Sequence, residues 1–153
     1  MINLKSKMKI LFTGGGTGGH SMPIVAIARE LKKLKPENEL HYIGPKSDHD
    51  LMSKEGFKVH AIVSGKIRRY FSLKNIIDVV SNLPFGFLQS FFLLLFIRPK
   101  LVFSKGGTGS LPVTYCARLF RIPVFIHESD IVPGLSNKVS SKWAKKVFIS
   151  FEN

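Results

Sequence analysis

The stretch MKILFTGGGTGGH, residues 8–20, joins a short apolar run to a glycine-rich loop and ends on a histidine. Met8–Phe12 has the length and composition of a buried strand. The loop Thr13–His20 is followed by Pro23–Leu34, where apolar side chains recur at helical spacing. A strand, a glycine loop and a helix in this order are typical of the start of a βαβ unit.

Apolar runs and helical stretches keep alternating after this unit. This pattern predicts an α/β fold with a Rossmann-like, doubly wound parallel sheet, in a single domain over residues 1–153. The further strands are expected at Leu40–Ile43, Lys58–Ile62, Leu101–Ser104, Val124–Ile126 and Val147–Ser150. The further helices are expected at Asp50–Lys54, Ser72–Leu83, Phe85–Ile97, Leu111–Leu119 and Ser136–Trp143, with Pro84 breaking the helical pattern between the second and the third.

The composition points to an anionic partner, because the net charge is +13 and the isoelectric point is near 10.1. Nucleic acid, an acidic membrane surface and a phosphorylated substrate all carry the required charge. Cys116 is the only cysteine, so an internal disulfide is excluded, and no Cys/His spacing predicts a zinc site. The apolar run after Lys5, Lys7 and Lys9 is too short for a signal peptide, so we expect a cytoplasmic protein.

The first glycine loop is suited to an anion. Glycines let the backbone turn sharply and approach a ligand, and the N-terminus of the following helix offers free N–H groups to a phosphate. A P-loop would need Lys followed by Ser or Thr after its last glycine, and His20-Ser21 stands there instead. Nicotinamide binding is weakly supported, since Asp48 and Asp50 lie beyond the second strand. His20, at the helix N-terminus, is expected to be neutral and to act as a general base, or only to bond the loop.

A second loop of the same kind, Ser104–Ser110, follows the fourth strand. In a doubly wound sheet, the loops at the carboxyl ends of such strands face one crevice. The next strand delivers His127-Glu128-Ser129-Asp130 to the same edge, and Pro133–Lys138 follows. The two loops and this polar cluster together predict one anion-binding site.

With these motifs in place, the sequence resembles the N-terminal domain of the MurG-like GT-B glycosyltransferases, glycosyltransferase family 28. The matching residues are the loop at 15–20, Gly106-Gly107, His127-Glu128 and Pro133–Lys138, in family order over essentially the whole chain. The resemblance implies transfer of N-acetylglucosamine from UDP-GlcNAc to a lipid-diphosphate-linked muramoyl-pentapeptide in peptidoglycan synthesis. It implies no metal and no cofactor.

The resemblance also assigns residues to roles. His20 matches the base that takes the proton of the acceptor hydroxyl. The donor and its diphosphate are implied at Thr17, Gly18, Gly19 and Asp130. The acceptor is implied at Gly15, Gly16, Gly106, Gly107, Thr108, His127, Glu128 and Asn137. Thr108 stands where the family has an aromatic residue, and Ser129-Asp130 stands where it has Gln-Asn.

The second domain of the family, which carries most of the UDP-sugar site, has no counterpart in these 153 residues. The chain is therefore expected to need a donor-domain partner. A fragment, a truncated gene product and one subunit of a split enzyme stay open, as does a non-catalytic scaffold that presents the acceptor. Nucleic acid is not expected as a partner, because only the charge suggests it and no reading motif is present.

The resembled acceptor is a membrane lipid, so we expect peripheral binding at the cytoplasmic face of the membrane. Phe85–Ile97, the most apolar segment, spans about 20 Å as a helix and is too short to cross a bilayer. It is either a buried helix or part of a surface that inserts into an anionic leaflet. The residues expected to contact the membrane are Lys66, Arg68, Arg69, Tyr70, Phe71 and Lys74.

Overall fold

The computed structural model describes residues 7–15, 18–63, 82–107 and 109–151. Within them the chain forms a parallel sheet with the strand order β3-β2-β1-β4-β5-β6. The strands are β1 (Lys9–Gly15), β2 (Glu39–Gly44), β3 (Lys58–Ala61), β4 (Leu101–Gly107), β5 (Val124–Glu128) and β6 (Lys146–Ile149). The order reverses between β1 and β4, which confirms the predicted doubly wound sheet.

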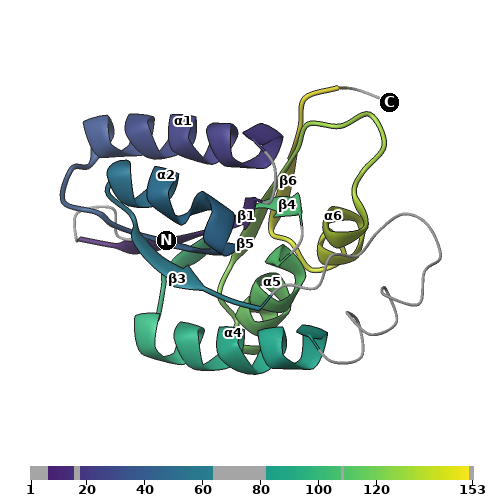
Figure 1. The fold of residues 1–153 in the computed structure, drawn as a ribbon. Helices are drawn as coiled ribbons and strands as arrows, with labels where there is room; N and C mark the ends of the chain where they lie inside the picture. Colours follow the sequence, from purple (N-terminus) through teal and green to yellow (C-terminus); the bar gives the residue numbers. More distant parts are fainter. Residues whose placement is uncertain (1–6, 16–17, 64–81, 108, 152–153) are drawn as a thin grey trace.

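Helices cover both faces of this sheet (Figure 1). Two of them, α1 (Gly18–Leu34) and α2 (His49–Lys54), lie on one face, and a short 3₁₀ turn, η1 (Lys46–Asp48), precedes α2. The opposite face carries α4 (Leu83–Ile97) and α5 (Ser110–Leu119), while α6 (Leu135–Ser140) lies beside β5 and β4. The layers follow from the rule that a strand buried on both faces needs a helix on each.

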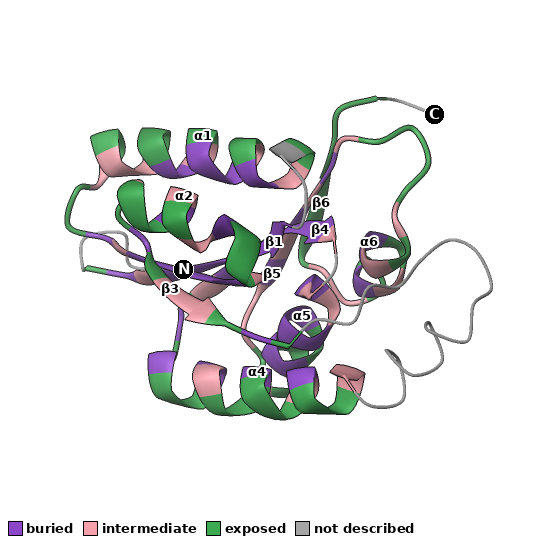
Figure 2. Ribbon diagram, viewed as in Figure 1, coloured by how far each residue is buried: buried purple, intermediate pink, exposed green. Residues whose placement is uncertain are grey.

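The core divides into two clusters, one on each face. The buried residues lie along the central strands and on the sides of the helices that cover them (Figure 2). Phe12, Tyr42 and Phe103 pack with α1 in the first cluster. Val102, Val124 and Ile126 pack with α4 and α5 in the second. Alternation along each strand thus assigns successive residues to opposite faces, and this decides where the polar residues at the strand ends lie.

Several predicted boundaries of helices and strands are wrong, most of them at the glycine loops. Both β1 and β4 run on to their glycines, Gly15 and Gly107, because these residues still pair with each other in the sheet. Helix α1 begins at Gly18 instead of Pro23, and Pro23 lies inside it. Helix α6 ends at Ser140 and is followed by turns, instead of running to Trp143. The longer α1 places His20 within its first turn.

Helix α4 begins at Leu83 with Pro84 in its first turn, where a missing N–H costs nothing. Pro84 therefore starts this helix, and the expected helix Ser72–Leu83 lies almost wholly outside the described residues. One side of α4 is buried through Gly86, Ser90, Leu94 and Ile97. No helix of the described residues has the length and hydropathy that crossing a bilayer requires.

The burial of one side of α4 can be tested with two leucines of the same helix. Leu94 is 1% exposed and Leu88 is 55% exposed. We expect Leu94→Ala to lower the free energy of unfolding by about 2–5 kcal/mol, because it leaves a cavity in the core. Leu88→Ala should cost less than about 1 kcal/mol. Urea unfolding measures both values, and equal losses would contradict the orientation of α4.

Candidate functional site

The two glycine loops meet where the strand order reverses. Gly15 of β1 and Gly107 of β4 are partners in the sheet, so the loops that follow these strands start side by side. A Cβ on Gly107 would lie 2.5 Å from the carbonyl oxygen of Gly15, and the backbone φ of Gly107 is +91°. Only glycine fits there. The structure therefore brings the two predicted loops to one edge of the sheet, at the switch point where doubly wound folds bind ligands.

Tyr42 and Asp48 brace the first loop from the neighbouring strand and its following turn. The Tyr42 hydroxyl lies 2.6 Å from the carbonyl oxygen of Gly14 and 3.0 Å from Asp48 Oδ2. Burial, together with the Asp48 carboxylate, raises the pKa of Tyr42 far above its ordinary range, so the hydroxyl keeps its proton. A Cβ on Gly15 would collide with both side chains. The path of the loop is thus fixed by two polar residues that the sequence analysis did not single out as site residues.

His20 lies in the first turn of α1, with its ring next to Gly107. Its Cδ2 would be 3.5 Å from a Cβ on that glycine, so the ring faces the second loop. Burial, and then the positive charge of Lys105, lower the pKa of His20 from its ordinary value of 6.5. Asp130, Glu128 and Asp48 act in the opposite direction. The predicted neutral imidazole is therefore supported, although burial and Lys105 account for it rather than the helix N-terminus alone.

Lys105 lies on the α1 face of the sheet, near enough to His20 and His127 for its charge to lower the pKa of both. It alternates with Phe103 of the first core cluster, and its Cβ lies close to Gly14 and α1. The side chain is buried, and its Nζ donates to Ser129 Oγ at 2.8 Å. The pKa of His127 is also lowered, first by burial and then by Lys105. The loop Ser104–Ser110 was singled out for its glycines, and the lysine beside them was not recognised.

His127 and Glu128, predicted together, point to opposite faces of β5. His127 alternates with Phe125 and shares the α1 face, where its Nε2 lies 3.3 Å from Ser150 Oγ. Glu128 alternates with Ile126 and faces α6, where its Oε2 accepts a hydrogen bond from Asn137 Nδ2 at 2.9 Å. The structure therefore places His127, and not Glu128, on the face of the sheet that carries His20.

The Glu128 carboxylate organises the loop that follows β5. It accepts N–H bonds from Asp130 at 2.9 Å and Gly134 at 3.2 Å, besides the bond from Asn137. Burial raises the pKa of Glu128, but these donors together with Lys105 outweigh it, and the net pKa is below the ordinary value. Both Glu128 and Asn137 are buried, and Asp130 is exposed at the loop. The carboxylate thus fixes the position of Asp130, the residue expected to contact the donor.

The second loop is held by hydroxyl groups. Ser110 and Ser136 both donate to the carbonyl oxygen of Gly107 at 3.0 Å. The N–H of Gly106 donates to Ser104 Oγ at 3.2 Å, so this amide is engaged within the loop. Helix α5 begins at Ser110, directly after these contacts. The N-termini of α1 and α5 therefore both lie at the switch point.

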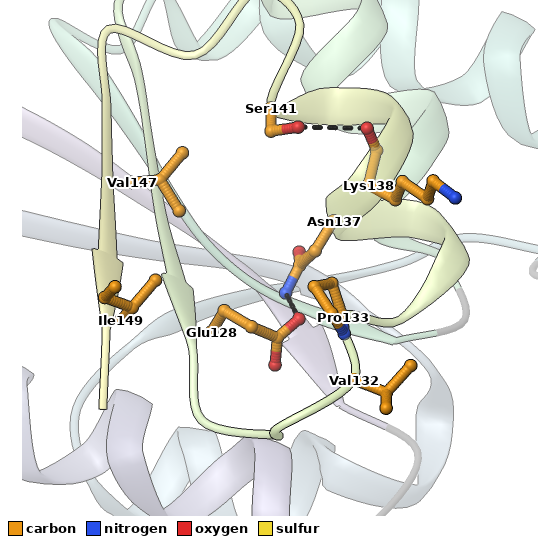
Figure 3. Close-up of a pocket in the computed structure, with 8 residues that line it drawn as sticks. All are labelled: Glu128, Val132, Pro133, Asn137, Lys138, Ser141, Val147 and Ile149. Carbon is orange, nitrogen blue, oxygen red and sulfur yellow. Dashed lines mark hydrogen bonds between the residues drawn. The ribbon is translucent and has the colours of Figure 1, made fainter. Parts of the chain in front are cut away.

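A separate pocket of about 340 Å³ opens between α6 and β6 (Figure 3). Glu128 and Asn137 lie at its base, joined by their hydrogen bond. Its remaining lining residues are Val132, Pro133, Lys138, Ser141, Val147 and Ile149. The pocket lies on the α6 face, so it is distinct from the group formed by His20, Lys105 and His127.

Several predicted site residues fall outside the described part of the chain. They are Gly16, Thr17 and Thr108 of the glycine loops, and Lys66, Arg68, Arg69, Tyr70, Phe71 and Lys74 of the expected membrane surface. Gly18 and Gly19 form the start of α1. Among the described residues, no group of His, Cys, Asp and Glu is arranged to hold a metal ion.

Comparison with known proteins identifies the family. Residues 10–149 match the sequence pattern of the Glycosyltransferase family 28 N-terminal domain. This chain belongs to glycosyltransferase family 28. A family 28 relative from Streptococcus mutans is 45% identical over 152 residues, and one from Borrelia hermsii is 42% identical over 152 residues. Both are named UDP-N-acetylglucosamine–N-acetylmuramyl-(pentapeptide) pyrophosphoryl-undecaprenol N-acetylglucosamine transferase.

The family 28 chain covers only part of these relatives. The alignments include 96% and 97% of this chain, but 41% and 42% of the two relatives. Solved structures agree on the fold. MurG from Acinetobacter baumannii matches 95% of this chain and 42% of its own with a TM-score of 0.77 at 22% identity. The calicheamicin glycosyltransferase CalG4 matches 89% and 36% with a TM-score of 0.62 at 14% identity. The predicted N-terminal half of a GT-B fold is confirmed.

The bracing of the first loop gives a test of the family 28 site. Tyr42→Phe removes the hydroxyl that donates to the buried Gly14 carbonyl and bonds to Asp48. Because both groups lose this hydrogen-bond partner, we expect the free energy of unfolding to fall by about 1–3 kcal/mol. Tyr115→Phe, at a tyrosine that is 41% exposed, is the matched control and should cost less than about 0.5 kcal/mol. Urea unfolding measures both. An unchanged stability for Tyr42→Phe would show that the hydroxyl does not brace the loop.

Proposed function

We propose that this chain is the acceptor-binding half of an N-acetylglucosaminyltransferase, which moves GlcNAc from UDP-GlcNAc to a lipid-diphosphate-linked sugar in peptidoglycan synthesis. The names of the relatives describe transfer of N-acetylglucosamine to an N-acetylmuramyl-(pentapeptide) pyrophosphoryl-undecaprenol acceptor. In the proposed reaction the acceptor is lipid I and the product is lipid II. The observation that carries the proposal is the position of His20, in the first turn of α1 and against Gly107 of the second glycine loop.

In this proposal, different residues of the glycine loops bind the acceptor and the donor. The diphosphate of the acceptor lies at the switch point, where the N-termini of α1 and α5 supply N–H groups and partial positive charge. Gly15, Gly107 and His127 lie at this edge, and Gly16, Gly106 and Thr108 belong to the same loops. Thr17, Gly18, Gly19 and Asp130 approach the donor diphosphate. Glu128 and Asn137 act on the acceptor from the α6 side, at the base of the pocket in Figure 3.

His20 supplies the base in this proposal. Its neutral imidazole takes the proton of the acceptor sugar hydroxyl while that oxygen bonds to C1 of GlcNAc. The bond from C1 to the UDP oxygen breaks, UDP leaves with the electron pair, and the configuration at C1 inverts. The donor-binding domain comes from the remainder of a longer chain or from a partner chain, since the relatives are more than twice as long as this sequence.

The membrane part of the proposal rests on the outer side of α4. Its exposed apolar residues are Phe85, Leu88, Phe91, Phe92, Leu95 and Phe96. Arg98 is exposed directly after the helix, and the chain carries a net charge of +13. An apolar row with a cation at its end suits the surface of an anionic leaflet. We propose peripheral binding there, which would present the lipid acceptor to the switch point.

The role of His20 is tested with this chain joined to the C-terminal remainder of the Streptococcus mutans relative. We expect His20→Ala to lower kcat for GlcNAc transfer by about 10²–10⁴, with little change in the acceptor KM. Since the folded pKa of His20 lies below 6.5, activity should be full at neutral pH and fall as the imidazole is protonated. The matched control is His60→Ala, at a partly buried histidine of the edge strand β3, and it should keep the wild-type rate. Full activity of His20→Ala would instead support a non-catalytic scaffold that presents the acceptor.

Membrane binding is tested by co-sedimentation of the chain with vesicles. We expect binding to vesicles that contain phosphatidylglycerol, weak binding to vesicles of phosphatidylcholine alone, and loss of binding as salt rises. Phe85→Ser with Phe96→Ser should reduce binding, because these two side chains are 62% and 77% exposed. Leu34→Ser, at a residue of α1 that is 75% exposed, is the control. Binding that depends neither on the anionic lipid nor on the two phenylalanines would refute the proposed membrane binding through α4.

A further inference from the structure

Lys105 is a buried lysine to which the proposed mechanism assigns no role. The residue is 2% exposed, and its Nζ donates to the neutral hydroxyl of Ser129. Within the described residues, no carboxylate lies within ion-pair distance of this ammonium group. Glu128 is near enough to be influenced by its charge, but Oε1 and Oε2 bond to Asp130, Gly134 and Asn137 instead.

A buried cation without an anionic partner is costly, because the lost hydration is not replaced by an opposite charge. An ammonium group has three N–H donors, and Ser129 accepts one. A second buried polar atom lies on the same face of the sheet, since His127 Nδ1 has no hydrogen-bond partner among the described residues. Two incompletely satisfied polar groups at the switch point indicate that an anionic ligand completes this site.

We propose that the Lys105 ammonium, held in place by Ser129, is the cation of the anion site between the two glycine loops and binds the acceptor diphosphate. The inference rests on the proposed function for the identity of that diphosphate, while the anion site itself rests on the geometry. The N-termini of α1 and α5 supply N–H groups and partial charges. Lys105 adds a full positive charge to them, at a buried position where screening by solvent is weak.

The same ammonium keeps His20 in its proton-accepting form. The charged groups near enough to influence His20 are Lys105 from β4, Glu128 and Asp130 from β5 and its following loop, and Asp48 from η1. The three carboxylates favour the imidazolium and Lys105 opposes it. Because the lysine is anchored through Ser129, its position relative to the imidazole is fixed before any ligand arrives. One side chain thus serves both the anion and the base.

The inference is tested with inorganic pyrophosphate as the probe and the 153-residue chain in calorimetry. We expect Lys105→Met to weaken pyrophosphate binding by about tenfold to a hundredfold, which is the effect of losing a charge-assisted hydrogen bond. Lys100→Met is the matched control. It removes the same charge at the amino end of β4, at the opposite edge of the sheet, and should bind like the wild type. Lys105→Arg should restore part of the affinity. If Lys105→Met and Lys100→Met weaken pyrophosphate binding equally, the effect comes from the net charge of the chain alone, and the inference is overturned.

A second readout follows the protonation of His20 by NMR titration of its ring. We expect the midpoint to rise toward 6.5 in Lys105→Met and to stay at the wild-type value in Lys100→Met. Ser129→Ala, which frees the ammonium and keeps the charge, should weaken pyrophosphate binding without unfolding the protein. An unchanged midpoint in Lys105→Met, or a wild-type chain that binds no pyrophosphate, would overturn the inference.

These outcomes are separable from the fate of the proposed function. Lys105-dependent pyrophosphate binding together with a joined enzyme that transfers no GlcNAc would refute the transferase and keep the anion site. An active joined enzyme in which Lys105→Met keeps the wild-type rate and affinity would refute the role of Lys105 alone. A folding defect is not expected to intervene, since methionine can replace a buried lysine in shape without its desolvation cost.

Discussion

The pairing of Gly15 with Gly107 is the constraint on which the rest of the site depends. These glycines belong to strands that lie far apart in the sequence. A Cβ on Gly107 would collide with the backbone of Gly15, and a Cβ on Gly15 would collide with Tyr42 and Asp48, so β1 and β4 stay paired to their ends only with glycine at both positions. The contact brings both loops, and the helices that follow them, to one point. His20 reaches the second loop only because α1 starts directly after the first.

The electrostatics of the site follow from the alternation of side chains along the strands. Lys105 and His127 lie on the α1 face with His20, whereas Glu128 lies on the α6 face. The Glu128 carboxylate therefore accepts hydrogen bonds from the loop that follows β5. The Lys105 ammonium group remains available to an anionic ligand on the face that carries the His20 imidazole. Had β5 been shifted by one residue, Glu128 would share the α1 face with Lys105, and an ion pair there would compete with an anionic ligand.

The sequence predicted the fold well because short apolar runs between helical stretches are typical of a parallel sheet. It located His20 and both glycine loops because a glycine cluster between a buried strand and a helix is typical of an anion-binding turn. It missed the ends of β1 and β4, because glycine is a poor strand former and the pairing that keeps it extended is a contact between distant segments. Lys105, Tyr42 and Asp48 were missed because nothing local separates a buried polar residue from an exposed one.

Helix α4 connects the proposed membrane surface to the anion site through packing alone. Its inner side contacts α5. Helix α5 begins at Ser110, and the hydroxyl of this residue donates to the carbonyl oxygen of Gly107 in the second glycine loop. A chain lying with the outer side of α4 on a lipid surface would therefore hold the switch point at a fixed height and tilt above it. A lipid-linked diphosphate has its charged group at the same boundary between membrane and water. The fold thus offers one rigid connection, from α4 through α5 to Gly107, that would set the distance between the bilayer and the phosphates that the proposed function requires it to bind.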